Sequence, residues 1–115
     1  MNELVKILSG SKHEILLNRV DPCVDYLKER LALNCVHVYF TSTQTELGIR
    51  LDTANCDYSK ADMSNGLGTL YLQGAITLNY DQVRCFLEVD LQTMRGYGCL
   101  AEISDSDYQR IISIS

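Results

Sequence analysis

The sequence predicts a single α+β domain over residues 1–115, in which an N-terminal helical segment packs on a five-stranded, mainly antiparallel sheet and a short C-terminal helix follows. Two patterns carry this prediction: helical spacing of apolar residues before residue 34, and alternation of apolar and polar residues after it. The length of 115 residues suits one domain with its own core. Helices that precede a run of strands, without regular alternation between the two, favour this class over an α/β fold.

The first third of the chain shows helical periodicity. Apolar residues within 4–8 form a short amphipathic patch, which Gly10 would end. The four residues from Ser11 fit a capping box, and the Asp21–Pro22 pair is typical of a second helix start. Apolar spacing then continues, and the pattern leaves open one kinked helix or two over residues 11–33.

From Cys35 onward, apolar side chains recur at every second position, which predicts strands. Two strands are expected between residues 35 and 52, and the irregular segment 54–66 follows them. A short helical turn is expected within that segment, around residues 59–63. Ser104 is expected to cap the C-terminal helix, because an acidic residue follows three positions later.

A three-stranded meander is predicted over residues 67–103. A two-residue loop at Tyr80 and Asp81 would pair Leu78 with Val83, and a three-residue loop ending at Gly96 would pair Leu91 with Cys99. In this register Tyr97, Cys99, Ala101 and Ile103 point into the core, and Glu88 faces Glu102 across the strands, where like charges repel. The face left for solvent carries Tyr71, Gln73, Phe86, Glu88, Asp90, Leu100 and Glu102.

The charge is unevenly distributed along the chain. The net charge is −5, and residues 1–34 contain as many basic as acidic residues, whereas the remainder contains five basic and ten acidic ones. Such a balance argues against nucleic-acid binding, which needs a basic footprint, and against anionic membrane surfaces. It favours a basic protein partner through electrostatic steering.

Sequence motifs for catalysis or metal binding do not stand out. The five cysteines show no short spacing typical of metal sites, and we expect reduced structural thiols, with Cys56 alone in a polar loop. The two histidines, His13 and His37, lie in no catalytic pattern. No secretory signal is recognised at the start, so we expect a cytoplasmic, non-enzymatic protein without a cofactor or metal.

These observations favour a small acidic protein-binding module. The specific hypothesis is an inhibitor or immunity-type protein, similar in role to an antitoxin, that neutralises a basic partner such as a nuclease toxin. The alternative is a dimeric secretion chaperone or adaptor that holds a partner through apolar sheet surface, and a homodimer is possible in either case. The expected partner-binding residues are Asp57, Tyr58, Asp62, Tyr71, Phe86, Glu88, Asp90, Leu100 and Glu102.

Overall fold

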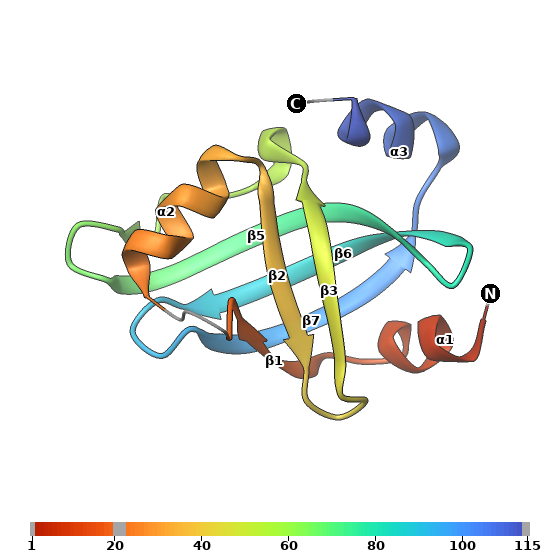
Figure 1. Ribbon diagram of the computed structural model, residues 1–115, viewed down its shortest axis with the longest axis horizontal. Coiled ribbons are helices and arrows are strands. Elements are labelled where there is room, and N and C mark those ends of the chain that lie inside the picture. Colours follow the sequence, from red (N-terminus) through yellow and green to blue (C-terminus); the bar gives the residue numbers. More distant parts are fainter. Residues whose placement is uncertain (1, 20–22, 114–115) are drawn as a thin grey trace.

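The centre of the molecule is a closed, six-stranded antiparallel β-barrel, seen in a computed structural model that describes residues 2–19 and 23–113 (Figure 1). Around the barrel the strands follow the order β3-β2-β1-β7-β6-β5, and pairing between β3 and β5 joins the two edges. A two-residue strand, β4, pairs with β5 in addition. The strands are β1 (His13–Leu17), β2 (Cys35–Phe40), β3 (Thr45–Leu51), β4 (Ala61–Asp62), β5 (Leu67–Leu78), β6 (Asp81–Asp90) and β7 (Arg95–Glu102).

The predicted α+β class is therefore confirmed, but the sheet differs from the prediction. The described residues form one seven-stranded sheet that curls into a barrel, in place of a five-stranded open sheet. Closure occurs where Arg50 pairs with Ala75 and Leu51 pairs with Gly74. Gly74 allows this approach, because a Cβ atom there would overlap the carbonyl oxygen of Arg50.

The core lies inside the barrel, because alternate side chains of each strand point inward. The buried strand residues include Ile15, Leu17, Val36, Val38, Phe40, Leu47, Ile49, Leu51, Leu70, Leu72, Val83, Cys85, Leu87, Val89 and Leu100. Apolar residues of α1 (Glu3–Ser9) and α2 (Val24–Ala32) complete the core.

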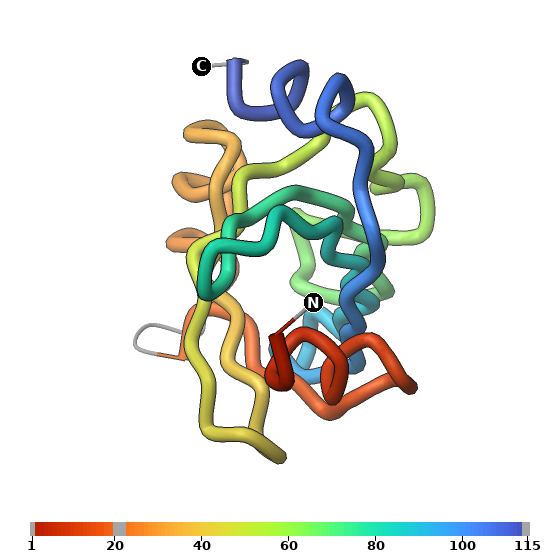
Figure 2. The backbone as a smooth tube through the Cα atoms, turned by 90° about the vertical axis from the view of Figure 1, so that its right-hand side faces the viewer, coloured from red at the N-terminus to blue at the C-terminus, as the bar shows by residue number. Residues whose placement is uncertain are grey.

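The helices lie at different places around the barrel (Figures 1 and 2). Helix α1 lies beside the β5–β6 turn, where Asn2 bonds to Asp81, and α2 lies near the opposite end, where Val24 approaches Gly66. Helix α3 (Asp105–Ile112) contacts β3, β5 and β6 from outside.

The helical prediction for residues 11–33 is only partly right. Residues 24–32 are helical, but His13–Leu17 form strand β1, so the capping box predicted at Ser11 is wrong. The strand is favoured because Ile15 and Leu17 are both buried while β1 pairs with β2 and β7. The start predicted at Asp21–Pro22 lies outside the described residues, and Cys23 is the observed N-cap of α2.

Two other local predictions can be compared with the structure. The C-terminal helix is confirmed, and the Ser104 side chain accepts a hydrogen bond from the Asp107 amide at 3.1 Å. The helical turn predicted around residues 59–63 is wrong, because that region contains β4, and a short 3-10 helix, η1, spans Thr53–Asn55 instead.

The meander β5–β6–β7 is confirmed, but both of its registers differ from the prediction. The first turn is at Asn79 and Tyr80, so that Leu78 pairs with Asp81. This is a shift by two positions, which preserves the inward and outward faces of both strands.

The second turn spans four residues, 91–94, so that Asp90 pairs with Arg95. The pairing of β6 with β7 is therefore shifted by an odd number of positions relative to the predicted pair of Leu91 with Cys99. Strand β7 is thereby inverted relative to the prediction, so Leu100 faces the core at 2% exposure and Tyr97 faces solvent at 54%. Two other inward positions of β7 are the glycines Gly96 and Gly98, and the last is Glu102, which is exposed at the end of the strand. A Cβ atom on Gly96 would overlap the carbonyl oxygen of Glu88, so close strand approach requires glycine there.

Candidate functional site

The outer face of β5, β6 and β7 bears a shallow groove, which we call the β5–β7 groove. One half, of about 210 Å³, is mainly aromatic and apolar, and the adjoining half, of about 460 Å³, is mainly polar. Glu88 and Tyr97 line both halves, so the two adjoin. The side chains that define the groove are Lys12, Glu14, Tyr71, Gln73, Phe86, Glu88, Asp90, Arg95 and Tyr97.

Strand pairing places the groove side chains in rows across the sheet. Glu88 lies between Tyr71 on β5 and Tyr97 on β7. In the neighbouring row, Phe86 lies opposite Gln73 and has 37% of its surface exposed. Side chains that face each other across antiparallel strands are in contact distance, so the aromatic rings flank a carboxylate on a rigid surface.

The groove contains both signs of charge. The Lys12 Nζ lies 3.7 Å from Glu88 Oε2, and Arg95 Nη1 lies 3.9 Å from Glu14 Oε1. Exposed ion pairs of this kind contribute about 0.2–1 kcal/mol, so a cation from a partner can displace them. The Asp90 carboxylate accepts a hydrogen bond from the Gln92 amide at 2.9 Å.

One of the predicted loop residues, Asp57, lies beside the groove, and Tyr58 follows it in the loop. The backbone of Asp57 pairs with that of Tyr71, with the Asp57 amide donating to the Tyr71 carbonyl at 2.8 Å. Hydrogen bonds from the hydroxyl and amide of Ser59 lower the pKa of Asp57, which keeps it ionised. Burial raises the pKa of Tyr58 to about 12, so its hydroxyl is protonated at neutral pH.

The third loop acid, Asp62, is also held by local hydrogen bonds. The side chain and amide of Asn65 donate to its carboxylate and lower its pKa. Asp62 lies on β4 opposite Leu67, and it does not line either half of the groove.

Two further predicted binding residues, Leu100 and Glu102, do not belong to the groove either. Leu100 is buried in the core, and Glu102 lies opposite Val83, toward the far end of β6. Glu88 therefore faces Tyr97, and the predicted repulsion between Glu88 and Glu102 is wrong. Both errors follow from the odd shift of β7, which also explains why the sequence interpretation missed Tyr97 as a groove residue.

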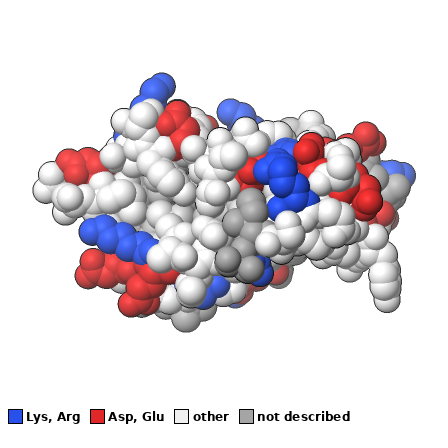
Figure 3. All heavy atoms as spheres, turned by 90° about the horizontal axis from the view of Figure 1, so that it is seen from above, with Lys and Arg blue, Asp and Glu red and all other residues white. Residues whose placement is uncertain are grey.

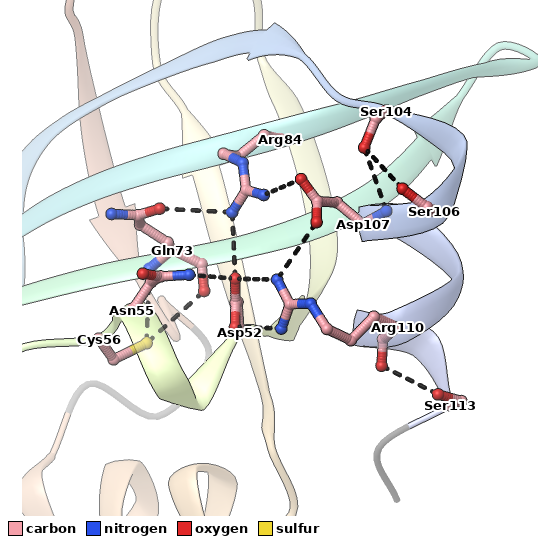
Figure 4. A network of polar contacts seen from close by, with 10 residues as sticks. All are labelled: Asp52, Asn55, Cys56, Gln73, Arg84, Ser104, Ser106, Asp107, Arg110 and Ser113. Carbon is pink, nitrogen blue, oxygen red and sulfur yellow. Dashed lines mark hydrogen bonds and ion pairs between the residues drawn. The ribbon is translucent and has the colours of Figure 1, made fainter.

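A second polar cluster, which we call the Asp52 cluster, lies where β3 ends (Figure 4). The Asp52 side chain is fully buried, and its carboxylate receives both terminal nitrogens of Arg110 at 3.1 Å each. Arg84 Nη1 donates to it at 3.1 Å and Asn55 Nδ2 at 2.7 Å. These donors come from α3, β6 and η1, so one carboxylate joins three elements.

The Asp52 cluster attaches α3 to the barrel. Hydrogen bonds from Arg110, then from Asn55 and Arg84, hold the pKa of Asp52 well below its ordinary value of 3.8 and outweigh the opposing effect of burial. Tyr108 adds a contact of 2.6 Å with the Thr77 hydroxyl. Figure 3 shows acidic and basic side chains interspersed on the face that carries α2 and α3, as such pairing requires. We interpret the cluster as structural, because its carboxylate is surrounded by its own chain.

The histidines also have structural surroundings. The His13 ring lies 2.9 Å from the Ile7 carbonyl and 3.1 Å from the Ser42 hydroxyl, so it bridges α1 and the β2–β3 turn. His37 packs beside Gly48 on the neighbouring strand. Within residues 2–19 and 23–113, no group of three or more His, Cys, Asp or Glu side chains is arranged to hold a metal ion.

Two cysteines differ from the sequence interpretation in their exposure. Cys56 is half-buried and its Sγ lies 3.5 Å from the Gln73 amide, whereas Cys23 is exposed. Burial raises the pKa of the Cys56 thiol, so the sulfur is uncharged at neutral pH.

Comparison of the chain with models of known protein families gives no match, and comparison with curated proteins gives no significant match. None of the helices within residues 2–19 and 23–113 is both long enough and apolar enough to span a membrane. The functional interpretation therefore depends on the geometry of the surface itself.

Proposed function

We propose that this protein is a non-enzymatic protein-binding module that holds a basic partner in the β5–β7 groove. The observation that carries the proposal is the exposure of Phe86 and Tyr97 beside Glu88 on the outer face of the barrel. Tyr97 lies opposite Glu88 across the strands, and Phe86 lies in the neighbouring row. Buried aromatic anchors surrounded by polar residues are typical of the energetic centres of protein interfaces. An inhibitor or immunity-type protein for a basic toxin fits this chemistry.

The charges of the groove support a partner with lysine or arginine side chains. Asp57 lies beside Tyr71, and Asp90 at the far end of the groove is fixed by its own turn. Lys12 and Arg95 already form weak pairs with groove carboxylates. A partner cation would replace these two side chains, which can then extend into water, so binding should depend on salt concentration.

Affinity capture with variants tests the proposal. The full chain, Phe86→Ala combined with Tyr97→Ala, and Leu33→Ala would each be used to capture proteins from the native host. Leu33 is the matched control, because it is 63% exposed and follows α2, away from the groove. We expect the wild type and Leu33→Ala to retain one basic protein that the double variant loses. Recovery of the same proteins with all three would contradict the proposal.

A second candidate is a dimeric chaperone or adaptor. The aromatic half of the groove favours it, because Tyr71, Phe86 and Cys99 offer a contiguous apolar strip to a second copy or to a partner segment. Sedimentation velocity distinguishes the two candidates. A stable dimer that Phe86→Arg converts to a monomer supports the chaperone, whereas a monomer whose partner affinity falls steeply with salt supports the inhibitor.

A further inference from the structure

The tip of the β5–β6 hairpin displays a tyrosine that makes little contact with the rest of the chain. Tyr80 is 99% exposed, the largest exposed fraction among the large apolar side chains of the described residues. It forms a two-residue turn with Asn79 between the paired residues Leu78 and Asp81. Exposed loop tips usually carry small or polar residues, so a full tyrosine ring at this point needs an explanation.

The backbone at the tip is unfavourable for tyrosine. Asn79 has φ 49° and Tyr80 has φ 72°, so both residues adopt the left-handed conformation of a type I′ turn. Asparagine suits the first position, but the second strongly favours glycine, because a side chain in this region meets its own backbone. The ring is almost wholly in solvent, so intramolecular packing does not offset this cost.

The tip is nevertheless held firmly. Asn2 Nδ2 donates to the Leu78 carbonyl at 2.9 Å and to Asp81 Oδ2 at 2.9 Å, and the Asn2 amide donates to the same oxygen at 2.6 Å. The Asn2 Oδ1 atom accepts from the Val5 amide at 3.0 Å and caps α1. The turn is thus fixed to a helix, which presents the ring in one orientation and lowers the entropy cost of binding through it.

The surroundings of the tip are acidic. Glu3 follows the clamping residue Asn2, Asp81 follows Tyr80, and Glu102 lies opposite Val83, two residues from Asp81. Of the ion pairs formed by the described residues, none involves these three carboxylates. Asp81 accepts hydrogen bonds from Asn2, so a surface that receives the ring would meet acidic side chains on the elements next to the tip that form no ion pair with another described residue.

We propose that Tyr80 is a preformed anchor that inserts into an apolar pocket of a protein partner, with lysine or arginine side chains at the rim of that pocket. Tyrosine supplies a large contact area at low entropy cost and is enriched among interface hot spots. This contact is separate from the β5–β7 groove, because α3 occupies the outer face next to the tip, where Tyr108 meets Thr77. The proposal therefore stands even if the groove binds nothing.

The first measurement concerns the turn itself. Tyr80→Gly removes the ring and places the favoured residue in the left-handed position, so we expect its melting temperature to rise by a few degrees. A lower melting temperature would mean that the ring stabilises the fold, and this would overturn the proposal.

The second measurement concerns the partner. A photo-crosslinking residue, p-benzoylphenylalanine, would replace Tyr80 in the full chain in host cells, and Leu33 in a matched control. We expect one protein to be crosslinked from position 80 and not from position 33. That protein, purified, should bind Tyr80→Ala and Tyr80→Gly at least tenfold more weakly than the wild type, and Glu102→Gln several-fold more weakly.

Three results of this second measurement would also overturn the proposal: no specific adduct at position 80, an adduct only with a second copy of this chain, or affinities for the wild type and Tyr80→Ala that agree within twofold. Phe86→Ala serves as the control that separates this contact from the groove. If that variant binds as the wild type does while Tyr80→Ala does not, the anchor is upheld and the groove is not involved. A loss with Phe86→Ala alone would support the groove and refute the anchor.

Discussion

Replacing Asp52 by asparagine tests the central electrostatic claim about this fold. The substitution preserves the shape of the side chain but removes the charge that receives Arg84 and Arg110. Arg84 has only 13% of its side chain exposed, so it cannot turn into water when its partner is neutral. Its other contacts, to Gln73 Oε1 at 3.4 Å and to Asp107 Oδ2 at 3.6 Å, are longer. Arg110, at 43% exposure, can turn outward. The loss of folding free energy in Asp52→Asn therefore comes mainly from Arg84, which stays buried without its counter-charge.

The expected loss is large for a domain of this size. Removing one partner of a buried ion pair costs about 3–5 kcal/mol, and the free energy of unfolding of a small domain is about 5–15 kcal/mol in total. In urea, with an m-value of about 2 kcal/mol/M, the unfolding midpoint should fall by roughly 2 M. Asp105→Asn is the matched control, because Asp105 is an exposed carboxylate on α3. A loss below about 1 kcal/mol, or one equal to that of the control, would refute the reasoning.

The stabilities of the wild type and of Asp52→Asn should depend differently on pH in the acid range. The pKa of Asp52 is lowered in the folded state, so its contribution is complete above the unfolded-state pKa, near 3.8, and is lost as the pH falls through the folded-state value. The difference in unfolding midpoint between the wild type and Asp52→Asn should therefore be constant near neutrality and shrink below about pH 4. A difference that stays constant into strong acid would contradict the assigned cause.

Further predictions concern packing and reactivity. Leu100→Ala should lower the free energy of unfolding by about 2–5 kcal/mol, because Leu100 is a core residue. Tyr97→Ala, on the surface, should lower it far less in the same urea titration. Equal losses would contradict the register of β7. Gly96→Ala should destabilise the barrel more than Gly10→Ala in thermal unfolding, because only the former Cβ overlaps a neighbouring strand. In native protein, a thiol reagent followed by peptide mass spectrometry should modify Cys23 first and Cys85 last, since burial raises the pKa of Cys85 and shields it; early modification of Cys85 would show that the barrel opens readily.

The parts of the fold that could be predicted are those encoded by local periodicity. Alternation alone predicts the meander, and the capping pattern at Ser104 predicts α3. Strand β1 could not be predicted, because the run Ile15-Leu16-Leu17 suits a helix as well as a strand and only its two neighbouring strands decide. Barrel closure could not be predicted either, because it depends on the pairing of Leu51 with Gly74, which are far apart in the sequence.

The candidate site likewise contains residues whose positions follow from local periodicity and others whose positions depend on long-range pairing. The face on which Tyr71, Phe86, Glu88 and Asp90 lie agrees with the prediction, because a register shift of two positions leaves the faces of a strand unchanged. Leu100 and Tyr97 were exchanged, because the length of the second turn was misjudged and a glycine-rich inward face resembles a polar one. The two arginine partners of Asp52 lie 32 and 58 residues away along the chain, so sequence spacing carries no signal for them.

The place where the barrel closes also governs how the molecule can open. The pairing between β3 and β5 consists of two residue pairs. Next to them, the Asp52 amide donates a hydrogen bond to the Gln73 carbonyl at 2.8 Å. The side chain of that same Asp52 holds α3. Separating β3 from β5 therefore displaces the carboxylate on which the helix depends, and releasing the helix leaves that carboxylate buried without its main counter-charge. Helix α3 and the last pairing of the barrel thus form one cooperative opening unit, although they are far apart along the chain.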